Sequence, residues 1–131
     1  MQENFSIVNK SKSTKHQKWS SVPFALMKDK ALGKNYSLSL VFINEKESRK
    51  LNNTYRGKNK PTNILSFPLD KKSGEIFITP TIAKKEAKTF GRKSDNFIAF
   101  LFIHGLMHLK GMDHSSTMDR AEEKLRKQFD I

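Results

Sequence analysis

Three histidines are the residues of this chain best suited to chemistry. His104, His108 and His114 fall within an eleven-residue window of a sequence with four histidines. Histidines four apart on a helix share a face, and Gly111 can take the positive φ that lets the chain double back with the third ring. Three imidazoles around a divalent ion leave a position open for water, as in catalytic zinc sites. The spacing predicts one divalent metal ion, with Zn²⁺ favoured; separate surface and core histidines are the alternative.

The same spacing occurs in the long zinc-protease motif H-E-x-x-H-x-x-G-x-x-H. Those proteases use the glutamate after the first histidine as general base, and Gly105 occupies that position here. Peptide hydrolysis therefore lacks its proton acceptor. A metalloprotease-like hydrolase is accordingly the least favoured of the three functions considered for this chain. Asp113, beside the third histidine, is either an acceptor for an imidazole N–H or a cap for the turn before the last helix.

A basic cluster upstream points to phosphate. Arg56, Lys58 and Lys60 lie close together, in what we expect to be a loop before a strand. A guanidinium offers forked donors that match phosphate oxygens, and Gly57 leaves the loop free to approach a ligand. The cluster predicts a substrate-binding site for a phosphate group; an ordinary exposed basic loop is the alternative on these residues alone.

Composition and charge support a polyanionic partner. The 131 residues fit one domain, residues 1–131, and carry a net charge of +12. Residues 10–93 hold twenty basic and six acidic side chains, whereas residues 94–131 hold five and six. The absence of cysteine excludes disulfides and thiolate metal sites. The longest apolar run, Phe97–Ile103, is too short for a membrane span, so we expect a cytoplasmic protein with no membrane partner.

The elements that must position these residues follow from periodicity and from capping residues. We predict strands at Phe5–Val8, Leu38–Ile43, Asn63–Leu69 and Glu75–Thr79, with the last two joined as a hairpin. We predict five helices. The first starts at Ser21 and stops at Gly33, the second is short and starts with the capping box of Asn44 and Glu47, and the third starts at Thr79 and stops at Gly91. The fourth starts at Ser94 and runs through Lys110, and the last spans about Thr117–Phe129. The Ser94 helix is apolar nearly all round, so it should be buried at the centre. This order predicts an α/β (α+β) fold with a small mixed sheet packed by helices.

With these motifs in order, the sequence resembles the bacterial YbeY-type endoribonuclease and rRNA maturation factor family. The string HGLMHLKGMDH, residues 104–114, is similar to the family's H-G-x-L-H-L-x-G-Y-D-H. Residues 51–68, LNNTYRGKNKPTNILSFP, resemble L-N-x-x-Y-R-x-x-x-x-P-T-D-V-L-S-F-P, and GEIFI at 74–78 resembles the following G-D-I strand. The matches run from Asn44 to the final helix; the first forty residues match only in layout.

The resemblance implies roles for individual residues. His104, His108 and His114 would be the zinc ligands and part of the catalytic site, and Arg56 would act beside the metal on RNA. It also implies a four-stranded mixed sheet with about five helices and a buried helix that carries the metal. Two departures stand out: Asn63 replaces a usual aspartate that could support Arg56, and Met112 replaces a common tyrosine.

The function expected from the resemblance is zinc-dependent, single-strand-specific RNA cleavage. The family acts in maturation of the small-subunit rRNA 3′ end and in ribosome quality control, so RNA, the small ribosomal subunit, and a small-subunit protein or assembly GTPase are the expected partners. The runner-up hypothesis is a non-catalytic ribosome-assembly factor that binds RNA and whose ion only fixes the turn. Attack by water or by a 2′-hydroxyl is left open, as is the general acid.

Overall fold

The structure is a computed structural model that describes residues 4–11, 21–112 and 115–131. Within these ranges four strands and five helices form. The strands are β1 (Phe5–Asn9), β2 (Ser37–Phe42), β3 (Ile64–Asp70) and β4 (Ser73–Ile78). The helices are α1 (Phe24–Leu32), α2 (Glu45–Arg56), α3 (Pro80–Thr89), α4 (Ser94–Leu109) and α5 (Ser116–Gln128). The predicted order of strands and helices is confirmed.

The four strands form one mixed sheet in the order β1-β2-β4-β3. β2 pairs in parallel with β1 and β4, and β3 pairs with β4 antiparallel, with Ile64 opposite Ile78. The predicted hairpin is the β3–β4 pair, which turns at Lys71 and Lys72. Because β3 forms one edge of the sheet, the strand's outer side is not covered by another strand of the sheet.

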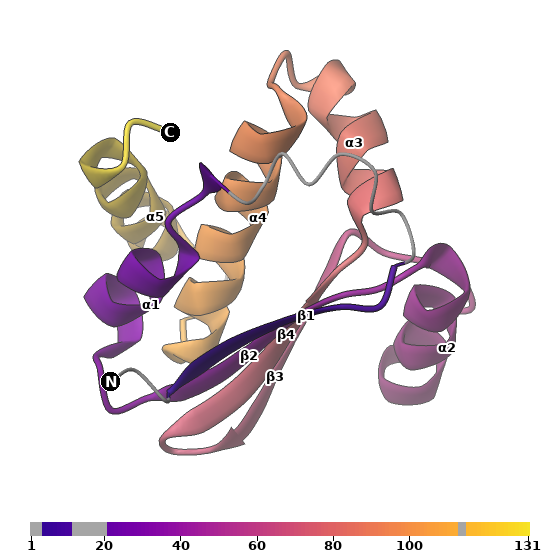
Figure 1. Ribbon diagram of the computed structural model, residues 1–131, viewed down its shortest axis with the longest axis horizontal. Helices are drawn as coiled ribbons and strands as arrows, with labels where there is room; N and C mark the ends of the chain where they lie inside the picture. The colour runs from indigo at the N-terminus through magenta and orange to yellow at the C-terminus, as the bar shows by residue number, and fades with distance from the viewer. Residues whose placement is uncertain (1–3, 12–20, 113–114) are drawn as a thin grey trace.

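α4 lies at the centre of the helical layer. It contacts β3 and β4 of the sheet and the helices α1, α3 and α5 (Figure 1). α2 stands apart from this group, at the opposite end of the molecule from α5 (Figure 1). A helix that is surrounded in this way needs apolar residues on most sides, and nine residues of α4 are buried, most of them within Phe97–Ile103. The prediction of a buried central helix is confirmed.

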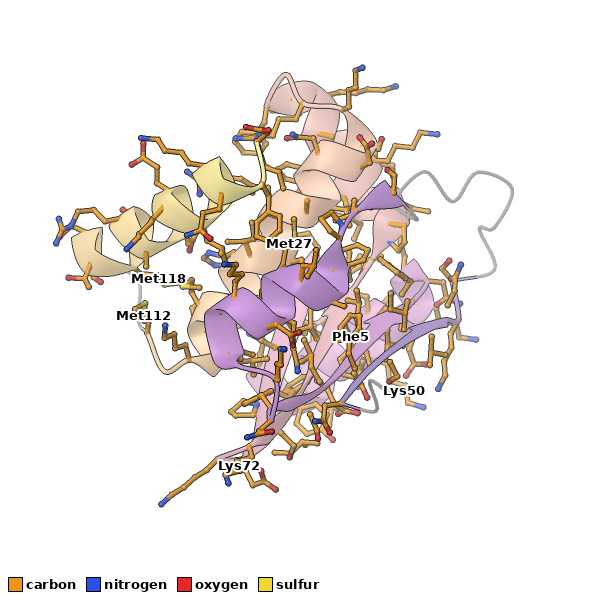
Figure 2. The ribbon with its side chains drawn as sticks, turned by 60° about the vertical axis from the view of Figure 1, so that its left-hand side comes forward. Phe5, Met27, Lys50, Lys72, Met112 and Met118 are labelled. Atoms are coloured by element: carbon orange, nitrogen blue, oxygen red, sulfur yellow. The ribbon has the colours of Figure 1, made fainter. Side chains whose placement is uncertain are left out.

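Methionines anchor the ends of the segments around α4. Met27 of α1 and Met118 of α5 are fully buried, and Met112 is partly buried against the same core. Figure 2 shows Met112 just beyond the end of α4 and Met118 near the start of α5. An unbranched thioether side chain fills irregular gaps well. Met112, the departure from the family's tyrosine, therefore packs against the core as a partly buried side chain.

Two predicted helix caps, Ser21 and Ser94, are wrong by one or two residues, whereas the last helix lies where it was predicted. Ser21 does not cap the first helix, which begins at Phe24 with Pro23 at the N-cap position. Ser94 is the first residue of α4 rather than its cap, and no side chain caps that end. The last helix is capped by Ser115, whose hydroxyl accepts from the Met118 N–H. In α1, the proline's missing N–H makes a side-chain cap less necessary at the first turn.

No helix in the described ranges is both long enough and apolar enough to cross a membrane.

Candidate active site

A cleft of about 710 Å³ opens along the β3 edge of the sheet. Its walls come from the end of α2, from residues 62–67 at the start of β3, from α4 and α5, and from the residue that follows α3. The sequence-predicted residues Arg56, His104 and His108 all line this cleft. Lys58 and Lys60 are exposed and do not line it. His114 and Asp113 lie outside the described residues.

His104 and His108 face each other across one turn of α4. Their Nε2 atoms are 3.1 Å apart, and their rings are nearly perpendicular, at 88°. Two imidazoles bound at 2.0–2.1 Å to one tetrahedral ion would place their nitrogens about 3.3 Å apart. The observed 3.1 Å is the length of a hydrogen bond between the two rings, and it is also close to the spacing that two ligands of a single ion would have. No group of three metal-binding side chains occurs among residues 4–11, 21–112 and 115–131, so the predicted third ligand is not tested.

Glu122 of α5 orients the first histidine. Its Oε2 lies 2.7 Å from Nδ1 of His104, and its Oε1 lies 3.6 Å from the Arg126 guanidinium. Glu122 itself is only 6% exposed. If Nδ1 carries the proton and donates it to this carboxylate, the Nε2 lone pair, which lies against His108 here, could instead be offered to a metal, which is the usual arrangement around histidine ligands.

Sequence reasoning missed Glu122, although a signal for it exists. Met118, Glu122 and Leu125 are the buried residues of α5 and recur at the spacing of one helix face. A carboxylate within an otherwise apolar stripe needs a partner, because burying a charge without one is costly. The role proposed for Asp113 as an imidazole acceptor is filled, for His104, by Glu122.

Arg56 is the last residue of α2 and not part of a loop as predicted. The helix extends through it and ends at Gly57, whose φ of 68° is left-handed. At the other end, the predicted capping by Asn44 is confirmed, because its Oδ1 accepts from the Glu47 N–H at 2.8 Å. The helix continues because residues 48–56 contain neither glycine nor proline to stop it. Arg56 is therefore held at its backbone by helical hydrogen bonds while its side chain reaches the cleft.

Two buried polar side chains of α2 fasten the chain that follows Arg56. The Ser48 hydroxyl donates to the Thr62 carbonyl at 3.0 Å and accepts from the Thr62 N–H at 2.9 Å. Asn52 donates through Nδ2 to the Lys60 carbonyl at 2.8 Å. These bonds bring residues 60–62 back along α2 toward the start of β3. They set the position of Arg56 relative to the β3 wall of the cleft.

Asn63, the departure from the family's aspartate, has a partner of its own. Its Nδ2 donates to Oε1 of Glu86, on α3, at 2.8 Å. A carboxylate at position 63 would face the Glu86 carboxylate, and like charges at hydrogen-bond distance repel. Asparagine and Glu86 are therefore matched in this chain. The side chain of Asn63 is thus hydrogen-bonded to α3.

Gly105 lies against the sheet and has no room for a side chain. A Cβ there would come within 2.9 Å of both Ile64 and Ser66 and within 3.1 Å of Ile76. Real Cβ atoms essentially never show the two 2.9 Å distances, so any side chain at position 105 requires the side chains of Ile64 and Ser66 to shift. The structure thus gives a packing reason for the missing protease base.

Comparison with known proteins identifies one family over nearly the whole chain. The Endoribonuclease YbeY family profile matches residues 3–130. The Endoribonuclease YbeY of Pseudoalteromonas translucida is 39% identical over 121 residues, which cover 84% of this chain and 80% of that protein. That of Aquifex aeolicus is 33% identical over 124 residues, covering 89% and 79%.

A solved structure shares the fold. A Thermotoga maritima protein, determined in solution, superimposes with a TM-score of 0.64 at 26% sequence identity, covering 92% of this chain and 85% of the other. The sheet order, the buried helix with its paired histidines and the profile match therefore agree, and the chain belongs to the YbeY endoribonuclease family.

Proposed function

We propose that this protein is a metal-dependent endoribonuclease that hydrolyses phosphodiester bonds of single-stranded RNA. His104, His108 and His114 would hold one divalent ion, with Zn²⁺ favoured by imidazole ligands. The proposed setting is the cytoplasm, where the enzyme would mature the 3′ end of small-subunit rRNA and take part in ribosome quality control. Its partners there would be the small ribosomal subunit and a small-subunit protein or an assembly GTPase.

One observation carries the proposal. Two imidazole nitrogens 3.1 Å apart meet in a cleft that is also lined by Arg56. The hydrogen bond from His104 to the buried Glu122 gives that ring a defined orientation. A helix-surface pair without a ligand would need neither a buried carboxylate behind it nor an open cleft in front of it. The fit of this donor set to a divalent ion is therefore good.

The chain's own residues contribute binding and charge. A divalent ion in such a site supplies Lewis acidity and lowers the pKa of its bound water toward about 7. Glu122 accepts from Nδ1 of His104 in the tautomer that would present Nε2 to an ion. Arg56 would bind a phosphate oxygen in bidentate fashion and stabilise the negative charge that grows on the phosphoryl group.

The basic surface suits a nucleic-acid backbone. Exposed cations lie on α2 and on the segment that follows it, including Lys58 and Lys60, and Lys50 extends outward from α2 (Figure 2). For single strands, affinity should fall with salt at a slope of about −0.7 per neutralised phosphate. We expect Lys58→Ala and Lys60→Ala to reduce that slope without changing turnover at saturating RNA.

The test compares cleavage and metal content in four proteins. These are the wild type, His108→Ala, Arg56→Ala and the control Lys72→Ala, whose exposed lysine lies at the hairpin tip away from the cleft (Figure 2). Loss of one charge-stabilising donor costs about 100- to 1000-fold in turnover, so Arg56→Ala should lose activity while it keeps one ion per chain. His108→Ala should lose both the ion and the activity.

The outcomes separate the alternatives. If folded His108→Ala cleaves RNA at the wild-type rate, the nuclease proposal is wrong. If the wild type binds RNA and one ion but never cleaves, the non-catalytic assembly factor is correct instead. The product ends decide the nucleophile, because a cyclic phosphate requires attack by the 2′-hydroxyl rather than by water.

A further inference from the structure

Phe90 is the most unusual apolar residue beside the cleft. It follows α3 as that helix's C-cap, lines the cleft and remains 64% exposed. Its ring is stacked on that of the buried Phe97, with centroids 5.4 Å apart and an angle of 15° between the planes. One side of the ring is thus held in a fixed orientation, while most of its surface stays in contact with solvent. An apolar surface kept exposed and fixed in orientation is suited to binding.

The stacking continues along the wall of the cleft. The ring of Phe97 is in turn parallel to that of Phe100, at 5.7 Å and 10°. The guanidinium carbons of Arg92 and Arg126 lie 4.6 and 5.0 Å from the Phe100 centroid. Cations over an aromatic face interact favourably with its quadrupole. Phe90, Phe97 and Phe100 therefore form an aromatic column, with two positive charges at its inner end.

This aromatic column leads to the histidine pair. Phe97, Phe100 and His104 are spaced by three and four residues, so they share one face of α4. With a rise of about 1.5 Å per residue, Phe97 lies roughly 10 Å along the helix from His104. The outer end of the column is therefore within a few nucleotides of the proposed cleavage site, in the same cleft.

We propose that Phe90 is a stacking platform for an unpaired nucleobase of the bound RNA. This inference rests on the proposed function and adds the residue that selects single strands. The occupant follows from chemistry: stacking rings combined with cations are typical of single-strand binding, and Arg92, Lys93 and Lys88 carry positive charge beside Phe90. The nearby buried carboxylate of Glu122 is already paired with His104 and Arg126, so it adds little repulsion toward phosphate.

A stacking platform discriminates by strand state and not by sequence. Every base has a π-face, so the platform accepts any base that is free to leave its neighbours. In a duplex both faces of a base are covered by the stack, and exposing one costs a few kcal/mol. The ring of Phe90 should therefore raise the affinity for single strands and leave the affinity for duplexes unchanged.

The experiment measures Kd for a short labelled RNA, single-stranded or annealed, by anisotropy before cleavage begins, with cleavage then followed in the same samples. The proteins are the wild type, Phe90→Ala, Phe90→Trp and the control Leu26→Ala, which removes a 59%-exposed apolar side chain from α1, outside the cleft. Phe90→Ala should raise Kd for the single strand about 5- to 100-fold. Its duplex Kd should match that of the wild type, and Phe90→Trp and Leu26→Ala should bind single-stranded RNA like the wild type.

Each other outcome has a definite meaning. If Phe90→Ala binds single strands as the wild type does, the platform is wrong while the nuclease proposal stands. Equal losses for single strand and duplex, or a loss that tryptophan does not rescue, also overturn it. If the wild type neither binds nor cleaves single-stranded RNA, the proposed function itself fails.

Discussion

Replacing Glu122 by glutamine tests the metal site without touching a ligand. The substitution keeps the size of the side chain and an oxygen that can accept from Nδ1 of His104, but it removes the negative charge. In the wild type Arg126 lies 3.6 Å from Oε1 of Glu122, and the substitution leaves this guanidinium without its carboxylate partner. An uncompensated guanidinium beside a cation site and a weaker hold on the ring both disfavour a divalent ion.

The expected magnitude follows from the contact that is lost. Removing an outer partner of a histidine ligand typically costs 10- to 100-fold in metal affinity, which is about 1.4 to 2.7 kcal/mol. Because Glu122→Gln retains the hydrogen bond to His104, we expect about 10-fold weaker Zn²⁺ binding. Glu122→Ala removes the acceptor altogether and should reach about 100-fold.

The assay is a competition titration of Zn²⁺ against a chromophoric chelator. The matched control is Glu123→Gln, which changes net charge equally but removes a carboxylate whose side chain is 58% exposed and pairs with the exposed Lys127. Urea unfolding of the metal-free proteins separates an effect on the fold from an effect on the site. If Glu122→Gln binds Zn²⁺ as tightly as Glu123→Gln and the wild type, the role assigned to this carboxylate is refuted.

Three further predictions concern the scaffold around the cleft. Gly105→Ala should lower the free energy of urea unfolding by about 1–3 kcal/mol, because its Cβ overpacks the helix against the sheet; unchanged stability would contradict the contacts found there. Ser48→Ala should lower the free energy of urea unfolding by about 1–3 kcal/mol, because it leaves the Thr62 backbone groups unpaired. A slower cleavage rate would show that the substitution also moves the cleft wall. Wild-type stability together with a wild-type cleavage rate would contradict the role given to Ser48. Asp70→Asn should destabilise at neutral pH and not in strong acid. The Lys72 N–H, followed by the Ser73 hydroxyl, lowers the pKa of the Asp70 carboxyl in the folded state, so its contribution is present above the unfolded pKa and is lost as the pH falls through the folded pKa. A folded-state pKa at the ordinary value in an NMR titration would disprove it.

Local sequence determined the elements and the family of the chain. Hydrophobic periodicity located the strands and the buried helix, because a segment buried on most sides must be apolar on most sides. Asn44 predicted a helix start since its side chain can satisfy a free backbone N–H from residues three positions on. The predicted cap at Ser21 failed because capping residues are also common in turns, where they bond to the backbone without beginning a helix, whereas Ser94 lies one residue inside the helix it was expected to cap.

The length of α2, which extends through Arg56, could not be predicted from local sequence patterns. The motif that contains Arg56 is polar, and its lack of glycine and proline before Gly57 permits a helix without the apolar periodicity that would predict one. The buried face of α2 consists of Ser48 and Asn52, whose hydrogen bonds reach Thr62 and Lys60 eight to fourteen residues later. Such bonds stabilise the helix only after the chain has folded back, so periodicity of apolar residues could not reveal them.

The sequence by itself decided which residues could do chemistry: the histidines at i and i+4, the arginine ahead of β3 and the glycine in place of a protease base. The tertiary structure alone decided how they are used. It placed Glu122 behind His104 from eighteen residues away, matched Asn63 to Glu86 and brought Phe90 to the cleft of the histidines. These relations join separate elements, and their free energy depends on distances that exist only when α3, α4 and α5 pack together.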